Sequence, residues 1–111
     1  MAAGDVVITR TTCFGNGNHG DEMMVCGTVT LDGGNATPID LSGILSAIDG
    51  AVVSMEGSGA PGSDPSQITS AISSTTLNVY AWKVTGQADT ALIASADNAR
   101  LVNFMAFGPK K

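Results

Sequence analysis

The residues best suited to chemistry in this chain lie in one short segment, CFGNGNHGDEMMVCG, which runs from position 13 to position 27. It contains both cysteines, the only histidine and two adjacent acids. Four of these side chains could together bind a zinc ion: Cys13, His19, Asp21 and Cys26. Structural zinc sites usually contain closely spaced pairs such as C-x-x-C, and the spacing here, C-x5-H-x-D-x4-C, has no such pair. We therefore expect no metal and no other cofactor.

The glycines of the same segment match a nucleotide-binding pattern. Gly15, Gly17 and Gly20 fit G-x-G-x-x-G, which binds a dinucleotide when a strand precedes it and a helix follows, because the helix N-terminus then meets the pyrophosphate. The residues that follow, MMVCGTVTL, are typical of a strand instead. The segment is therefore predicted to be the turn of a β-hairpin and not a nucleotide site.

The two cysteines would face one another if this hairpin turned between His19 and Gly20. Directly opposed residues have Cβ atoms about 4.5–5.5 Å apart, so a strained disulfide between Cys13 and Cys26 is the alternative to free thiols. Thiols of proteins made in the cytosol stay reduced, and neither cysteine has a basic neighbour in the sequence that would favour the reactive thiolate. We expect both thiols to be free and neither to be catalytic.

No arrangement typical of an enzyme occurs elsewhere in the sequence. A nucleophile elbow, a P-loop and the H-E-x-x-H motif are absent. The single His19 lies in a predicted loop, where a general base would be held poorly. Tyr80 and Trp82 share one face of LNVYAWKV and could stack on a ligand, although such a pair on a strand more often belongs to a core or a subunit interface. We expect no enzymatic activity.

Short strands separated by turns must position these residues. Runs rich in valine, isoleucine and threonine predict strands over 5–14, 23–31, 51–56, 77–84, 91–94 and 101–107. Residues 68–72 are predicted to pair with the fourth of these strands as a second hairpin, or to form a short helix after Asp64. One or two helical turns are predicted over 39–47, weakened by an internal glycine. The sequence predicts an all-β fold: a single-domain β-sandwich or barrel over 1–111, with at most one short helix.

Two segments are expected to be exposed and mobile: a loop of small residues with two prolines over 57–66, and a C-terminal tail over 108–111. The net charge of −5, with only five basic residues, excludes the cationic face that nucleic-acid binding requires. No apolar run approaches the roughly 18 residues that span a membrane, and the start of the chain lacks a secretory signal. We expect a protein made in the cytosol that binds neither nucleic acid nor membrane.

Both ends of the chain carry distinctive motifs. Near the start are VVITRTTCFGN, MVCGTVTLDGG and TPIDLSG, and near the end are LNVYAWKV and TALIASADNARLVNFMAFG. In these motifs the chain resembles small structural proteins that tailed bacteriophages encode beside the major capsid protein. The resemblance implies a capsid decoration (cement) protein: an all-β homo-oligomer, dimer or trimer, that braces major capsid protein subunits on the outer surface of the virion. It would be made in the host cytoplasm.

Two features are candidates for the contact with the capsid. Met23 and Met24 are consecutive in a predicted strand, so alternation places one of them on the face opposite the core. The loop at 57–66 can adapt its shape to a neighbouring subunit. It contributes the candidate contact residues Ser58, Pro61 and Asp64. The alternative function is a small ligand- or carbohydrate-binding β-sandwich module that uses Trp82 or the same loop.

Overall fold

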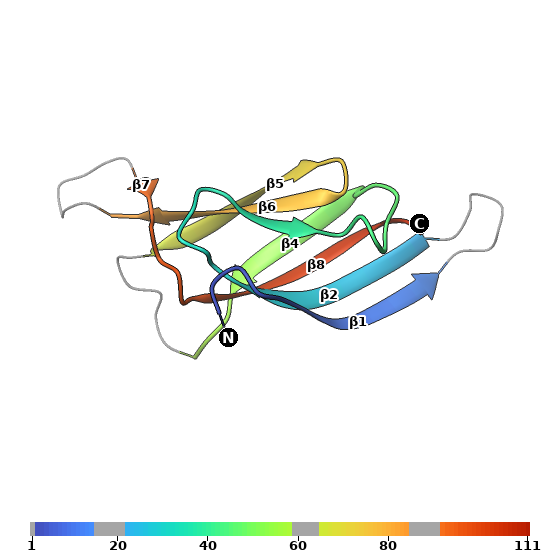
Figure 1. Ribbon diagram of the computed structural model, residues 1–111, viewed down its shortest axis with the longest axis horizontal. Coiled ribbons are helices and arrows are strands. Elements are labelled where there is room, and N and C mark those ends of the chain that lie inside the picture. Colours follow the sequence, from blue (N-terminus) through green and yellow to red (C-terminus); the bar gives the residue numbers. More distant parts are fainter. Residues whose placement is uncertain (1, 15–21, 59–64, 85–91) are drawn as a thin grey trace.

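The computed structural model describes residues 2–14, 22–58, 65–84 and 92–111, which form two antiparallel sheets packed as one β-sandwich (Figure 1). The strands in these residues are β1 (Val6–Phe14), β2 (Glu22–Thr30), β3 (Thr37–Asp40), β4 (Gly50–Met55), β5 (Gln67–Ser73), β6 (Thr76–Lys83), β7 (Ile93–Ala94) and β8 (Leu101–Pro109). One sheet has the order β1-β2-β8-β4 and the other β3-β6-β5, with β7 beside β6. The predicted all-β single domain is confirmed.

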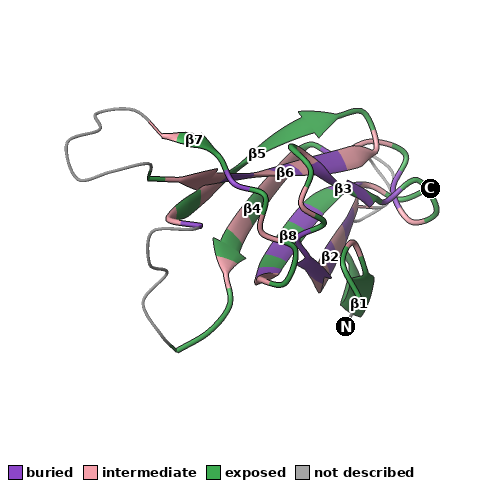
Figure 2. Ribbon diagram, turned by 60° about the vertical axis from the view of Figure 1, so that its left-hand side comes forward, coloured by how far each residue is buried: buried purple, intermediate pink, exposed green. Residues whose placement is uncertain are grey.

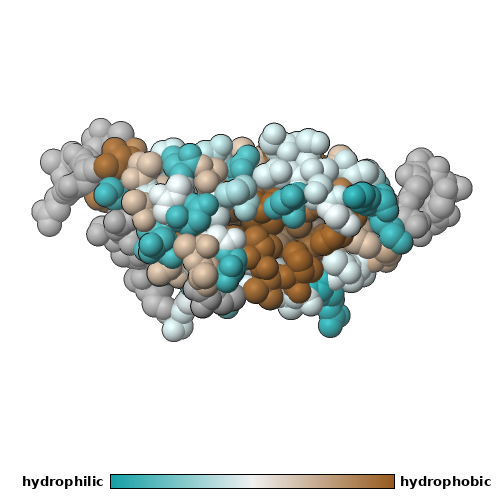
Figure 3. Space-filling view, viewed as in Figure 1, coloured by the Kyte–Doolittle hydropathy of each residue, from teal (hydrophilic) through white to brown (hydrophobic). Residues whose placement is uncertain are grey.

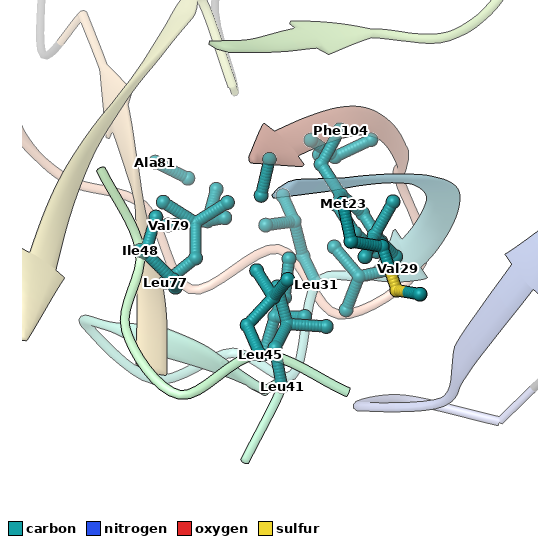
Figure 4. Close-up of a cluster of buried hydrophobic side chains, with 14 residues drawn as sticks. Met23, Val29, Leu31, Leu41, Leu45, Ile48, Leu77, Val79, Ala81 and Phe104 are labelled. Atoms are coloured by element: carbon teal, nitrogen blue, oxygen red, sulfur yellow. The ribbon is translucent and has the colours of Figure 1, made fainter. Parts of the chain in front are cut away.

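Period-two alternation in the central strands builds the core. In β2, β6 and β8 every second residue is buried, and the buried side chains of the two sheets meet in one cluster (Figure 4). From β2 and β8 the cluster takes Val25, Val29, Val102, Phe104 and Ala106, and from β6 it takes Leu77, Val79 and Ala81. The residues that alternate with these point to the outer faces of the two sheets. A thin but dry core therefore holds the sheets together.

The segment between β3 and β4 closes one end of this core without forming a helix. The amide of Leu45 donates to the carbonyl of Leu41 at 2.9 Å, which makes a single turn, and both side chains are fully buried. Ile48 follows them into the cluster (Figure 4). The helix predicted over 39–47 is wrong. The buried leucines of this segment lie on a single turn, and they cover one end of the core between the two sheets. The alternative helix after Asp64 is also wrong, since β5 begins at Gln67.

The C-terminal residues are part of the fold. Strand β8 extends to Pro109, whose carbonyl accepts a hydrogen bond from the amide of Ser46 at 2.9 Å. Lys110 forms an isolated antiparallel β-bridge with Leu45, and the amide of Lys111 donates to the carbonyl of Ile44 at 3.0 Å. The mobile tail expected over 108–111 is therefore wrong, because its main-chain groups pair with the turn that plugs the core.

Only the ends of the loop predicted over 57–66 belong to the described residues. Gly57 and Ser58 are exposed, whereas Pro65 is buried and the amide of Ser66 donates to the carbonyl of Trp82 at 2.8 Å. The second end of the loop is thus fixed to the sheet that contains β6.

Strand β1 extends beyond the cover of the second sheet. All of its residues from position 6 to position 13 are exposed, although it pairs along its length with β2 (Figure 2). A β-bulge between Ile8 and Arg10 shifts the register, so that Ile8 lies opposite Gly27 and Arg10 opposite Cys26. Apolar surface gathers in the middle of the view in Figure 3, where Figure 1 draws β2 and β8.

Candidate functional site

The residues that suggested thiol or metal chemistry are not brought together. Cys13 lies opposite Met23, and Cys26 lies opposite Arg10. This register puts Cys13 on the core-facing side of the sheet, opposite Met23, and Cys26 on the outer side. The predicted opposition of the two cysteines does not occur, and both are free.

This separation predicts how the thiols respond to oxidation. Because Cys13 and Cys26 point to opposite faces of one sheet, an intramolecular disulfide would require β1 to slip in register. We expect no intramolecular disulfide after mild oxidation with oxidised glutathione, so that intact mass in denaturant shows no species 2 Da lighter than the reduced monomer, whether or not the exposed Cys13 forms a mixed disulfide with glutathione. Quantitative loss of 2 Da with an unchanged fold would contradict the observed register.

Two of the four candidate metal ligands, Cys13 and Cys26, belong to the described residues. His19 and Asp21 lie outside the described residues. Within the residues that the structure describes, no group of three or more histidine, cysteine, aspartate or glutamate side chains is placed to hold a metal ion. The absence of a metal site stays a prediction.

The most distinctive surface is the outer face of the four-stranded sheet. Pairing aligns Met24, Phe107 and Gly50 in one row across β2, β8 and β4. The next row contains Cys26, Met105 and Val52. We call the five side chains of these rows the apolar outer face: Met24, Cys26, Val52, Met105 and Phe107. Because they come from adjacent strands in register, they form one contiguous patch.

Three of these side chains are well exposed. Val52 exposes 58% of its surface, Phe107 exposes 41% and Met105 exposes 36%. Such large apolar groups seldom lie together on the surface of a monomeric soluble protein. Beside them is a shallow depression of about 210 Å³ lined by residues of β4 and β8, among them Ser54 and Asn103. The patch is thus a nearly flat apolar area with a small hollow at one side.

The position of the Phe107 ring is set by its neighbour across the sheet. A Cβ atom built at Gly50 would lie 2.5 Å from Cζ of Phe107, so the aromatic ring lies across the backbone of β4. Glycine at this position lets the ring cover the strand. Two charged residues lie at the margin of the patch, where Arg10 is opposite Cys26 and Glu22 is opposite Pro109 in the strand register. An apolar centre with a polar margin is typical of a protein–protein interface.

The second aromatic feature lies on the outer face of the other sheet. The rings of Tyr80 and Trp82 have centroids 6.3 Å apart and an interplanar angle of 17°. The indole N–H of Trp82 donates to the hydroxyl of Thr69 at 2.9 Å. Both aromatic residues are half-buried, so the pair is not part of the core.

The predicted contact residues are distributed unequally. Met23 is a core residue, and Met24 lies on the outer face of the sheet, as alternation requires for one of the two. Ser58 is exposed, whereas Pro61 and Asp64 lie outside the described residues. The sequence prediction missed Val52, Met105 and Phe107. Their signal was present, since each alternates with buried or half-buried residues in AVVSM or LVNFMAF, but both faces of these strands are apolar.

With this surface described, the chain can be compared with known proteins. No family model, curated protein or solved structure matches it. The residues described here include no helix with the length and hydrophobicity needed to cross a bilayer. Function must therefore be argued from the apolar outer face and from the motifs in the sequence.

Proposed function

We propose that this chain is a structural protein that decorates the outer surface of an icosahedral phage head and braces its major capsid protein subunits. The observation that carries the proposal is the apolar outer face, which lies exposed on a hydrogen-bonded sheet among the residues that the structure describes. The motifs at both ends of the sequence supply the kind of partner, because they resemble those of phage decoration proteins. A non-enzymatic binding role agrees with both.

Physical arguments support a permanent partner for this face. Burial of apolar surface contributes roughly 25 cal/mol per Å², so covering Val52, Met105 and Phe107 would yield several kcal/mol. These side chains stand on paired strands, so ordering them at an interface costs less than ordering a loop. The net charge of −5 suits a position outside the head, away from packaged DNA.

Attachment to heads tests this proposal directly. The purified chain is mixed with expanded heads that lack decoration, and the heads are pelleted at increasing chain concentrations. We expect saturable binding with a fixed number of copies per head, since a lattice offers a fixed number of equivalent sites. Binding that rises linearly without a plateau, or no binding, would contradict the proposal.

The aromatic pair supports a second candidate, a small carbohydrate-binding module. Tyr80 and Trp82 present nearly parallel rings on an exposed sheet, and sugars stack on aromatic faces. Trp82 is the only tryptophan, so its fluorescence reports this surface alone. If the chain binds oligosaccharides, titration with them changes the Trp82 emission. The Trp82→Ala variant then no longer binds to immobilised oligosaccharides. An unchanged emission across an oligosaccharide panel would reject this function.

A further inference from the structure

The free edge of β1 is the longest unpaired strand edge in the described part of the four-stranded sheet. Strand β1 ends the order β1-β2-β8-β4, whereas β4, at the opposite end, lies beside β5 of the second sheet. Residues 6 to 13 of β1 are exposed on both faces. An edge of this kind presents main-chain N–H and C=O groups to a pairing partner.

The direction of the main-chain groups can be deduced from their contacts. The carbonyl of Asp5 accepts a hydrogen bond from the amide of Thr30 at 3.0 Å, and the carbonyl of Val7 lies against Gly27. Both therefore point toward β2. Because successive residues of a strand point their main-chain groups to opposite sides, those of Val6 and Ile8 point to the free edge.

The side chains around these groups are apolar on both faces of the sheet. Val6 and Ile8 lie opposite Val29 and Gly27 on the core-facing side, and Val7 lies on the outer side. They expose 37%, 37% and 44% of their surfaces. Exposed edges are usually protected by lysine, proline or a charged side chain turned inward. None of these occurs between positions 6 and 8, so this part of the edge is suited to pairing.

We propose that β1 of a second copy pairs antiparallel with this edge, about a two-fold axis beside Val7. In that register, Val6 of each copy lies opposite Ile8 of the other, and the two Val7 side chains meet at the axis. The free main-chain groups of Val6 and Ile8 then form hydrogen-bonded pairs on both sides of the axis. Six apolar side chains gather around it.

Charge and symmetry favour a second copy over an unrelated peptide. The proposed register sets Asp5 of one copy opposite Thr9 of the other, and hence beside Arg10, so two opposite-charge pairs form by symmetry. The two-fold axis is perpendicular to the sheet, so the joined eight-stranded sheet has both apolar outer faces on the same side. The inference concerns self-association and holds whether or not the chain binds heads.

Sedimentation equilibrium of the whole chain tests the dimer. We expect the average mass to approach twice the 11.2 kDa chain mass as concentration rises into the micromolar range. Val7→Lys places two like charges opposite one another at the axis and should raise the dimer dissociation constant about 100-fold. Val52→Lys adds the same charge to an exposed valine on β4 and should leave that constant unchanged.

A backbone variant tests the hydrogen bonds separately from the side chains. Val6→Pro removes an N–H that points to the free edge, and proline is tolerated at edges in that orientation. This variant should be monomeric, with thermal unfolding showing that the fold is retained. A wild-type chain that stays monomeric or forms trimers overturns the proposal, and so does a Val7→Lys variant that dimerises as the wild type does. Pelleting of monomeric Val7→Lys with heads tests the proposed function independently.

Discussion

If the chain decorates phage heads as we propose, substitution of Phe107 by aspartate is expected to weaken attachment by about 30-fold or more, which corresponds to about 2 kcal/mol. Phe107 is the only aromatic residue of the apolar outer face, and the end of its ring lies over Gly50 of β4. Aromatic side chains near the middle of an interface usually carry much of the binding energy. An aspartate there also places a carboxylate in a contact where it would lose water without gaining a partner. The measurement is the same pelleting assay with undecorated heads.

Two further variants make this result specific. Val52→Asp changes the most exposed member of the patch and should weaken attachment in the same way. Ile72→Asp is the matched control, because Ile72 lies on β5 of the other sheet and exposes 44% of its surface, close to the 41% of Phe107. All three should unfold at similar temperatures. Equal attachment of all three variants would mean that the head contacts another surface.

Substitution of Gly27 by alanine should have a large effect on stability. A Cβ atom at this position would collide with the main-chain carbonyl oxygen of Val7 and lie 3.0 Å from the ring of Phe104. The carbonyl belongs to the paired backbone next to the β-bulge and cannot turn aside as a side chain would. Overpacking of this kind costs about 3 kcal/mol, so the thermal unfolding midpoint should fall by roughly 10 °C or more.

Gly43→Ala is the control for this prediction. A Cβ atom there would have nothing within 4 Å, so its addition should change the free energy of unfolding by less than about 1 kcal/mol. Chemical denaturation of both variants beside the wild type gives the two differences. Equal stabilities of the two variants would show that β1 does not approach β2 as closely as described.

The alternation of apolar and polar residues was sufficient to predict most of this fold. It located β2, β6 and β8 within a few residues of their observed bounds. A period of two is a strong local signal when one face of a strand is dry and the other wet. The same rule predicted that one of two consecutive methionines would point outward.

The rest depended on information that local patterns do not hold. The register of the first hairpin differs by three positions from the predicted one, since Cys13 pairs with Met23 and not with Cys26. The run TRTT has side chains of similar polarity on both faces and gives no sign of the register, so the cysteines were paired wrongly. The ordering of Lys111 depends on Ile44, a partner 67 positions away. The apolar outer face was hidden because strands with two apolar faces resemble fully buried strands.

The position of β8 in its sheet also determines when the protein can fold during synthesis. This strand pairs with both β2 and β4, yet it is the last of the described strands to be synthesised. Until residues 101 to 109 have left the ribosome, β2 and β4 have no common neighbour. Their apolar side chains then remain exposed to solvent. Folding of the sandwich must therefore wait until β8 has been made, and β-pairings across such long separations form slowly. A nascent chain stalled before β8 would be a target for chaperones and proteases.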